Sequence, residues 1–239
     1  MSYALAIQVG SWLLWLPLKV LCISALLRVG VRRYPLIFAY MVVTFLTAAA
    51  QLPISFTFLR GNEHVGEWYQ TVNTVGDSAS YILILCVVVT FIIRATARTE
   101  SRRVVRTAVI SGATLLVLIS ALIHYRANAP LGAWAPYWTR DVHFGAAILD
   151  LAAWGMLVAM RDRESRLLLL TGGMGIMFAG EAVGAAVRSI AIPYKSIPIY
   201  YAGHILKVLT DAAFLYIWWQ TFRNEAKGKP QAHVTAKGN

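Results

Sequence analysis

A lysine and an aspartate lie in the middle of the apolar stretch IYYAGHILKVLTDAAFLYIWW, which runs from Ile199 to Trp219. His204, Lys207 and Asp211 are spaced three and four residues apart, and in a helix this spacing puts all three on one face. A charged group at the centre of a bilayer costs about 2.5–3.5 kcal/mol, so such groups should face a wet or paired interior. An amine and a carboxylate placed there could bind an ionic solute or exchange protons.

Further acidic and polar residues occur in other apolar stretches. Asn73, Asp77 and Tyr81 form a second stripe with a spacing of four, and Asp150 and Glu181 lie in two later stretches. Ionisable groups inside a membrane are functional candidates by default. The predicted ligand- or proton-binding residues are therefore Lys207, Asp211, Asp77, Asp150, Glu181, His204, Asn73 and Tyr81.

Acids outnumber amines in these stretches. The four carboxylates named above accompany two lysines, Lys19 and Lys207, and Lys19 is close enough to one end of its stretch to reach the membrane surface. At least one of Asp77, Asp150 and Asp211 should therefore be protonated or hold a cation or a cationic ligand. Lys207 is expected to pair with Asp77 or Asp211 and to change partner when a solute or a proton arrives.

Polar residues in a membrane can also serve only to join helices, each hydrogen bond contributing about 0.6–2 kcal/mol. This interpretation is favoured for Thr44, Thr47 and Ser80, and the GxxxG pattern of Gly180 and Gly184 favours close helix contact. The alternative to a solute site is a structural subunit of a larger membrane complex, in which the acids would contact the helices of partner subunits.

The elements that must position these residues are membrane-spanning helices. Of the 239 residues, 58% are hydrophobic and 14% are charged, whereas a soluble domain carries about a quarter charged residues. Lipid offers the backbone no hydrogen-bond partner, and about 17–25 residues cross the hydrocarbon core as a helix. The sequence therefore predicts an all-α bundle of seven transmembrane helices within residues 1–222, at about 3–27, 35–59, 68–93, 104–123, 142–160, 167–187 and 197–222.

Basic residues are distributed unequally between the two ends of these helices. The net charge is +11, yet the sequence has no basic domain, so nucleic acid is not an expected partner. The connections at 28–33, 94–106 and 161–166 and the tail after 222 hold fifteen Lys and Arg residues, and the opposite side holds five. Since the more basic side is cytoplasmic, the N-terminus should be outside and residues 223–239 should form a flexible cytoplasmic tail, in a plasma membrane or a bacterial inner membrane.

The directions of the predicted helices permit an internal repeat. The first three and the last three helices run in the same directions, and the fourth could link them in a 3+1+3 arrangement. This organisation resembles that of the small sugar and amino-acid transporters of the SWEET and PQ-loop type. The resemblance is one of architecture only and implies a solute path between two three-helix units.

Lys207, in the middle of the seventh helix, also resembles the lysine that carries retinal as a Schiff base in the microbial rhodopsins. With Asp77 as the counterion, this resemblance implies a retinal-binding photoreceptor or pump. Two features depart from that family. Asp211 follows the lysine by one turn where the family has an aspartate one turn before it, and the sixth helix lacks the expected proline and offers Phe178 as its one aromatic residue.

Enzyme and metal motifs are not found. His124, His143 and His204 should lie toward the same membrane side, but the chain has no HxxxH pair, and it has no nucleophile elbow, Walker loop or zincin motif. No metal is predicted, an enzyme is not favoured, and the cofactor is left unknown. The sequence predicts a multi-pass membrane protein whose ionisable cavity binds a small or cationic solute, with proton-linked transport or sensing.

Overall fold

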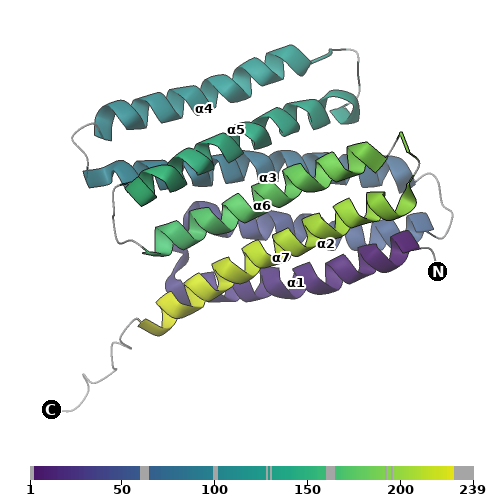
Figure 1. The fold of residues 1–239 in the computed structure, drawn as a ribbon, viewed down its shortest axis with the longest axis horizontal. Helices are drawn as coiled ribbons and strands as arrows, with labels where there is room; N and C mark the ends of the chain where they lie inside the picture. Colours follow the sequence, from purple (N-terminus) through teal and green to yellow (C-terminus); the bar gives the residue numbers. More distant parts are fainter. Residues whose placement is uncertain are drawn as a thin grey trace.

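The part of the chain that the structure describes consists of long α-helices and two short 3₁₀ turns, without strands (Figure 1). The computed structural model describes residues 3–59, 65–98, 102–127, 129, 131–159, 165–191, 193–194 and 196–228. The seven α-helices are α1 (Tyr3–Val29), α2 (Pro35–Leu59), α3 (Val65–Ala95), α4 (Arg102–His124), α5 (Leu131–Ala159), α6 (Ser165–Ala191) and α7 (Ile197–Gly228). The 3₁₀ turns are Val31–Arg33 and Thr96–Arg98.

Large apolar side chains cover the outside of the helices. Six helices, α1 to α6, are long and apolar enough to cross a membrane, and α7 has comparable length but carries the polar stripe of Lys207 and Asp211. Soluble monomers rarely expose such extensive apolar surface, so the chain is a multi-pass membrane protein. Each helix, α7 included, has a large apolar side chain that is at least half exposed: Leu13, Leu46, Val75, Leu122, Leu151, Val183 and Leu209.

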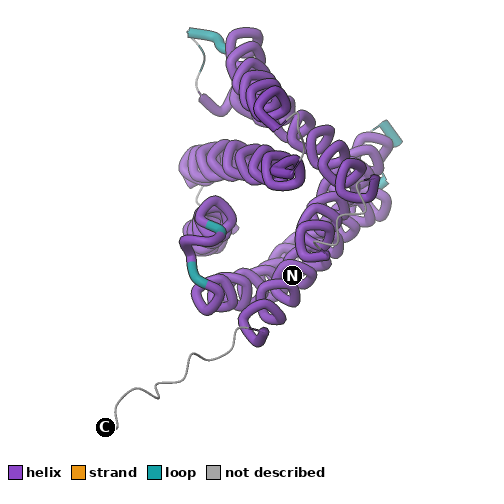
Figure 2. The backbone as a smooth tube through the Cα atoms, turned by 90° about the vertical axis from the view of Figure 1, so that its left-hand side faces the viewer, coloured by secondary structure: helices purple, strands orange, loops and turns teal. Residues whose placement is uncertain are grey.

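Six of the helices pack in a closed order, and the seventh lies outside it. Helices α1, α2, α3, α5, α6 and α7 each contact the next, and α7 contacts α1 (Figure 2). Among the described elements, helix α4 packs against α3, α5 and the adjoining 3₁₀ turn alone, at the edge of the molecule (Figure 1). If α1, α2 and α3 are exchanged with α5, α6 and α7, each pair of neighbouring helices maps onto another neighbouring pair. The packing order is therefore compatible with the predicted 3+1+3 arrangement.

Apolar side chains fill the half of the bundle that lies toward Val29 and Gly228. The indole N–H of Trp218 donates to the carbonyl oxygen of Leu170 at 3.0 Å, which closes α7 onto α6 within this core. Such close packing leaves no cavity among these side chains, so the polar stripes of α3 and α7 can face a cavity only in the other half. Fully buried side chains of the core include Leu26, Met41, Val88, Phe91, Met174, Trp218 and Phe222.

Helices α6 and α7 approach each other most closely at glycines. A Cβ atom added to Gly184 would lie 2.7 Å from the carbonyl oxygen of Gly203, and one added to Gly203 would lie 2.7 Å from that of Gly184. At Gly180 an added Cβ would collide with the side chain of Thr210. The close contact predicted from the GxxxG pattern is therefore confirmed, and its partner is α7.

All the helices except α2 are longer than the sequence predicted, and α5, α6 and α7 by six residues or more; α6 covers 165–191 rather than 167–187. Helix α5 begins at Leu131 rather than at residue 142, although this segment contains Pro136 and charged residues. Its Asp141 carboxylate accepts a hydrogen bond from Ser120 at 3.0 Å and lies 2.8 Å from Nε2 of His124, which ties α5 to α4. Helix α7 continues to Gly228, so the first residues of the predicted tail are helical; residues 229–239 lie outside the described residues.

Candidate functional site

A cavity of about 470 Å³ lies near the middle of the bundle, adjacent to the apolar core. Six helices contribute to its walls, and the phenol of Tyr40 and the ring of Phe214 lie on the side of the core. Seven of the eight predicted site residues line it, Asp150 being the exception. Its polar and ionisable lining is Ser11, Lys19, Tyr40, Thr44, Thr47, Gln51, Tyr69, Asn73, Asp77, Ser80, Tyr81, His143, Glu181, His204, Lys207 and Asp211, and its tryptophans are Trp12 and Trp15.

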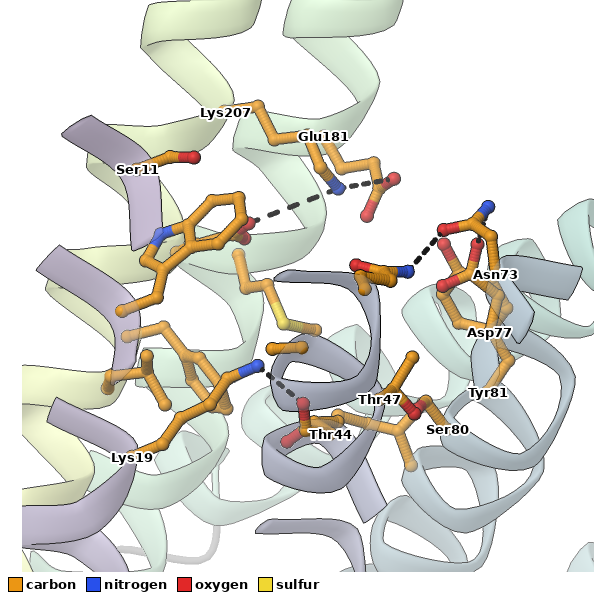
Figure 3. Close-up of a pocket in the computed structure, with 18 of the residues that line it drawn as sticks. Ser11, Lys19, Thr44, Thr47, Asn73, Asp77, Ser80, Tyr81, Glu181 and Lys207 are labelled. Atoms are coloured by element: carbon orange, nitrogen blue, oxygen red, sulfur yellow. Dashed lines mark hydrogen bonds and ion pairs between the residues drawn. The ribbon is translucent and has the colours of Figure 1, made fainter. Parts of the chain in front are cut away.

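Lys207 is the centre of an ion-pair cluster in this cavity (Figure 3). Its Nζ lies 2.7 Å from Oε1 of Glu181 on α6 and 4.0 Å from Oδ2 of Asp211 on its own helix. The other carboxylate oxygen of Glu181 lies 3.4 Å from Nε2 of His143 on α5. The sequence predicted a pair with Asp77 or Asp211; Asp211 is within reach, but the nearest acid is Glu181.

The carboxylate of Asp77 accepts a hydrogen bond from an amide and does not form an ion pair within the described residues (Figure 3). The side-chain amide of Asn73 donates to Oδ2 of Asp77 at 3.1 Å, and Gln51 of α2 donates to Oδ1 of Asn73 at 2.7 Å. Within the described residues, no Lys, Arg or His nitrogen lies within 4 Å of the Asp77 carboxylate. The stripe of α3 therefore presents an acid that makes no direct ion pair with a cation of the described residues, although Lys207 and Lys19 act on it from a greater distance.

The second lysine of the cavity does not form such an ion pair with Asp77. Lys19 donates from Nζ to the main-chain carbonyl oxygen of Thr44 at 3.0 Å, and no carboxylate of the described residues lies within 4 Å of it (Figure 3). It lines the cavity instead of reaching the membrane surface. Three carboxylates therefore share the cavity with two lysines, so the cavity carries an excess negative charge when all three are ionised.

Tyr81 and His143 join α3 to α5 at the wall of the cavity. Their rings meet edge to face with centroids 4.6 Å apart, and the ring of Phe178 lies 4.9 Å from that of His143. A second cavity of about 380 Å³ between α3, α5 and α6 shares Asn73, Asp77, Tyr81, His143 and Glu181 with the first. These side chains thus form a partition that both cavities touch.

Asp150 lies outside the cavity, in the contact between α5 and α6. The residue is 2% exposed, its Oδ1 has no hydrogen-bond partner among the described residues, and a Cβ built at Gly175 of α6 would lie 3.7 Å from its Oδ2. His143 and Asp150 are seven residues apart and so share a face of α5, but Asp150 is two turns nearer the apolar core.

Replacing Asp150 with Asn should therefore leave solute and proton responses unchanged. A buried carboxylate without a cation is tolerated only with a proton bound, and an amide has the same shape and no charge, so the melting temperature should stay within a few degrees of the wild-type value or rise. Thermal unfolding in detergent, alongside a proton-release assay, checks both expectations. If folded Asp150→Asn protein lost the proton response, Asp150 would belong to the binding site after all.

Of the three described histidines, His143 and His204 line the same cavity, and His124 lies apart from them. His204 lines the cavity, His143 contacts Glu181, and His124 lies between α4 and α5 against Asp141. The described residues contain no group of three or more His, Cys, Asp or Glu side chains arranged to hold a metal ion.

Sequence reasoning missed some residues that the structure brings to the site. Three of them, His143, Gln51 and Lys19, are not among the predicted binding residues. Their partners lie on other helices, which the spacing along one helix does not reveal. Glu225 was assigned to the tail, although Trp218, Phe222 and Glu225 continue the helical spacing of four and three residues.

No family model, no curated protein and no solved structure matches this chain.

Proposed function

We propose that this membrane protein binds a small organic cation in its central cavity in exchange for a proton, and transports it. The proposed orientation has the N-terminus outside and the basic ends of the helices in the cytoplasm, in a plasma membrane or a bacterial inner membrane. The observation that carries the proposal is Asp77, a cavity-lining carboxylate bound by Asn73 with no cation of the described residues within 4 Å.

Aromatic side chains around the cavity support an organic rather than a metal cation. Trp12, Trp15, Tyr40, Tyr69 and Tyr81 all contribute to its lining. The face of an aromatic ring attracts a positive charge, by about 0.5–2 kcal/mol for each well-placed ring, and recognition of ammonium groups commonly combines such rings with an acid. A primary to quaternary amine therefore matches the chemistry of this lining.

The excess of acids supports a link to protons. Glu181 and Asp211 share Lys207, while Asp77 lacks a cation, so the empty cavity is best neutralised by a proton. A cationic solute would replace that proton. If the proton stayed, the neutral cavity would take on a net positive charge in a poorly solvated space. Binding should therefore release about one proton for each cation.

The packing of the bundle supports transport over simple binding. The cavity occupies one half of the bundle, and an apolar core closes the half toward Gly228. Helices α1–α3 and α5–α7 meet around the cavity in an order that is compatible with two three-helix units moving against each other. Seven of the eight predicted site residues face inward, which favours a solute site over the alternative of a structural subunit whose acids contact partner helices.

Asp77→Asn is expected to abolish cation–proton exchange. The amide keeps the size of the side chain and its contact with Asn73 but removes the charge, and loss of the acid partner should weaken cation binding by at least about tenfold. Proteoliposomes with a trapped pH dye, challenged with methylammonium, choline and tetramethylammonium, measure the exchange. Asp150→Asn is the matched control, because it is the same replacement at an acid outside the cavity.

Two results would contradict the proposal. One is wild-type protein that is folded yet exchanges none of the amines for protons. The other is Asp77→Asn protein that exchanges them at the wild-type rate. A visible absorption band on addition of retinal, lost in Lys207→Met, would instead support the retinal-binding alternative.

A further inference from the structure

A third pocket, separate from the two cavities described above, lies at the opposite end of the apolar core from the central cavity. It has a volume of about 350 Å³ and is formed by the turn before α2, the end of α3 and the start of α6. Its polar lining is Arg33, Tyr34, Arg94, Ser165 and Arg166, and Leu167 and Leu170 form the rest. No acid lines it within the described residues. This pocket has no part in the proposed exchange of a cation for a proton.

Arg94 is fixed in the pocket without an acidic partner among the described residues. Its Nη2 donates to the main-chain carbonyl oxygen of Arg33 at 2.8 Å, and its guanidinium lies 5.2 Å from the centre of the Tyr34 ring. Both contacts orient the guanidinium, but neither neutralises its charge. The guanidinium has five N–H donors, so most remain for an anion.

The other two arginines share one buried carboxylate beneath the pocket. Glu225 of α7 is 3% exposed and forms ion pairs with Arg33 and, at 3.4 Å, with Arg166. The phenol of Tyr34 donates to Oε2 of Glu225 at 3.1 Å, and burial together with the nearby Glu225 raises the pKa of that phenol, so it keeps its proton. Among the described residues, three arginines against one glutamate leave an excess of two positive charges.

The start of α6 adds neutral donors. Ser165 is the first residue of this helix, and Ser165, Arg166 and Leu167 all line the pocket. The first backbone N–H groups of a helix have no partner within it and point out of its N-terminus, where they bind phosphate and other anions. The pocket thus joins an excess charge of two with hydroxyl and N–H donors, a set suited to a phosphate group with two negative charges.

We propose that this pocket binds the phosphate group of an anionic ligand, either a lipid headgroup or a free phosphate compound. It lies at the end of the bundle where α3 ends and α6 begins, the side that the sequence predicts to be cytoplasmic. Basic pockets between helices at that surface bind anionic headgroups. A bound phosphate would also hold α3, the turn before α2 and α6 together.

Arg94→Gln tests the pocket, because Arg94 is the arginine that does not hold Glu225. Nanodiscs containing phosphatidic acid or only phosphatidylcholine measure the lipid arm, by native mass spectrometry of retained lipid. Inorganic phosphate added at constant ionic strength in detergent, with thermal unfolding as the readout, measures the free-phosphate arm. Wild-type protein should prefer phosphatidic acid or be stabilised by phosphate, and Arg94→Gln should weaken that binding at least tenfold.

Arg106→Gln is the matched control, since Arg106 lies at the same end of the molecule, on α4 and outside the pocket. It should bind like the wild type. Ser165→Ala serves as a second variant with little effect on folding and should weaken binding severalfold. Binding in the lipid arm alone would identify a headgroup, and binding in the detergent arm would identify a free phosphate compound. Wild-type protein that responds to neither probe, or equal losses in Arg94→Gln and Arg106→Gln, would overturn the proposal.

Discussion

Replacing Lys207 with Met is expected to abolish cation–proton exchange and to destabilise the bundle by about 3 kcal/mol, because removal of one partner leaves an uncompensated buried charge. Among the described residues, Glu181 would keep His143 as its one partner within 4 Å, and Asp211 would lose its nearest cation. Lys207→Arg keeps the charge but adds a rigid, bulkier fork, so it should restore activity only in part. Exchange in proteoliposomes and unfolding in mixed micelles measure the two effects.

A double-mutant cycle identifies the partner of Lys207. Lys207→Met and Glu181→Gln should couple by about 1–3 kcal/mol. The double variant should therefore lose less unfolding free energy than the two single variants lose together. Lys19→Met is the matched control: Lys19 lines the same cavity but donates to a carbonyl oxygen, and it should couple with Glu181→Gln much more weakly. Coupling of Lys207 with Glu181 no larger than that of Lys19 would remove the ion pair from the mechanism.

Gly184→Leu is expected to leave little folded protein. The Cβ atom alone would come 2.7 Å from the carbonyl oxygen of Gly203, and a backbone atom cannot move aside as a side chain does. Helices α6 and α7 would have to separate, and overpacking with loss of the helix contact should cost about 3 kcal/mol or more. The yield of monodisperse protein and its melting temperature report the effect.

Gly112→Leu provides the comparison for the same replacement. Gly112 lies on α4, and a Cβ added there meets nothing within 4 Å. It should therefore fold like the wild type, with a small gain in helix propensity. A Gly184→Leu protein as stable as Gly112→Leu would show that α6 and α7 are not in close contact in the membrane.

The helices and the stripes on them were determined by the sequence alone. In lipid each helix satisfies its own backbone hydrogen bonds, so a long apolar run is sufficient to predict it. Local geometry then places His204, Lys207 and Asp211 on one face of α7. Prediction was poorest where contacts between helices stabilise a less apolar segment: the start of α5, which is tied to α4 through Asp141, and the end of α7, where Glu225 binds arginines of other segments.

The choice of partners was decided only by the tertiary structure. Lys207 pairs with Glu181 because α6 and α7 meet at glycines, and neither the order of packing nor the rotation of a helix is contained in its own pattern. Asp150 shares a face of α5 with His143, yet it lies two turns, or about 10 Å, nearer the apolar core, beyond the end of the cavity. The spacing of residues along a helix determines which face each side chain is on. The depth of a side chain in the bundle and the residues that it contacts depend on how whole helices pack.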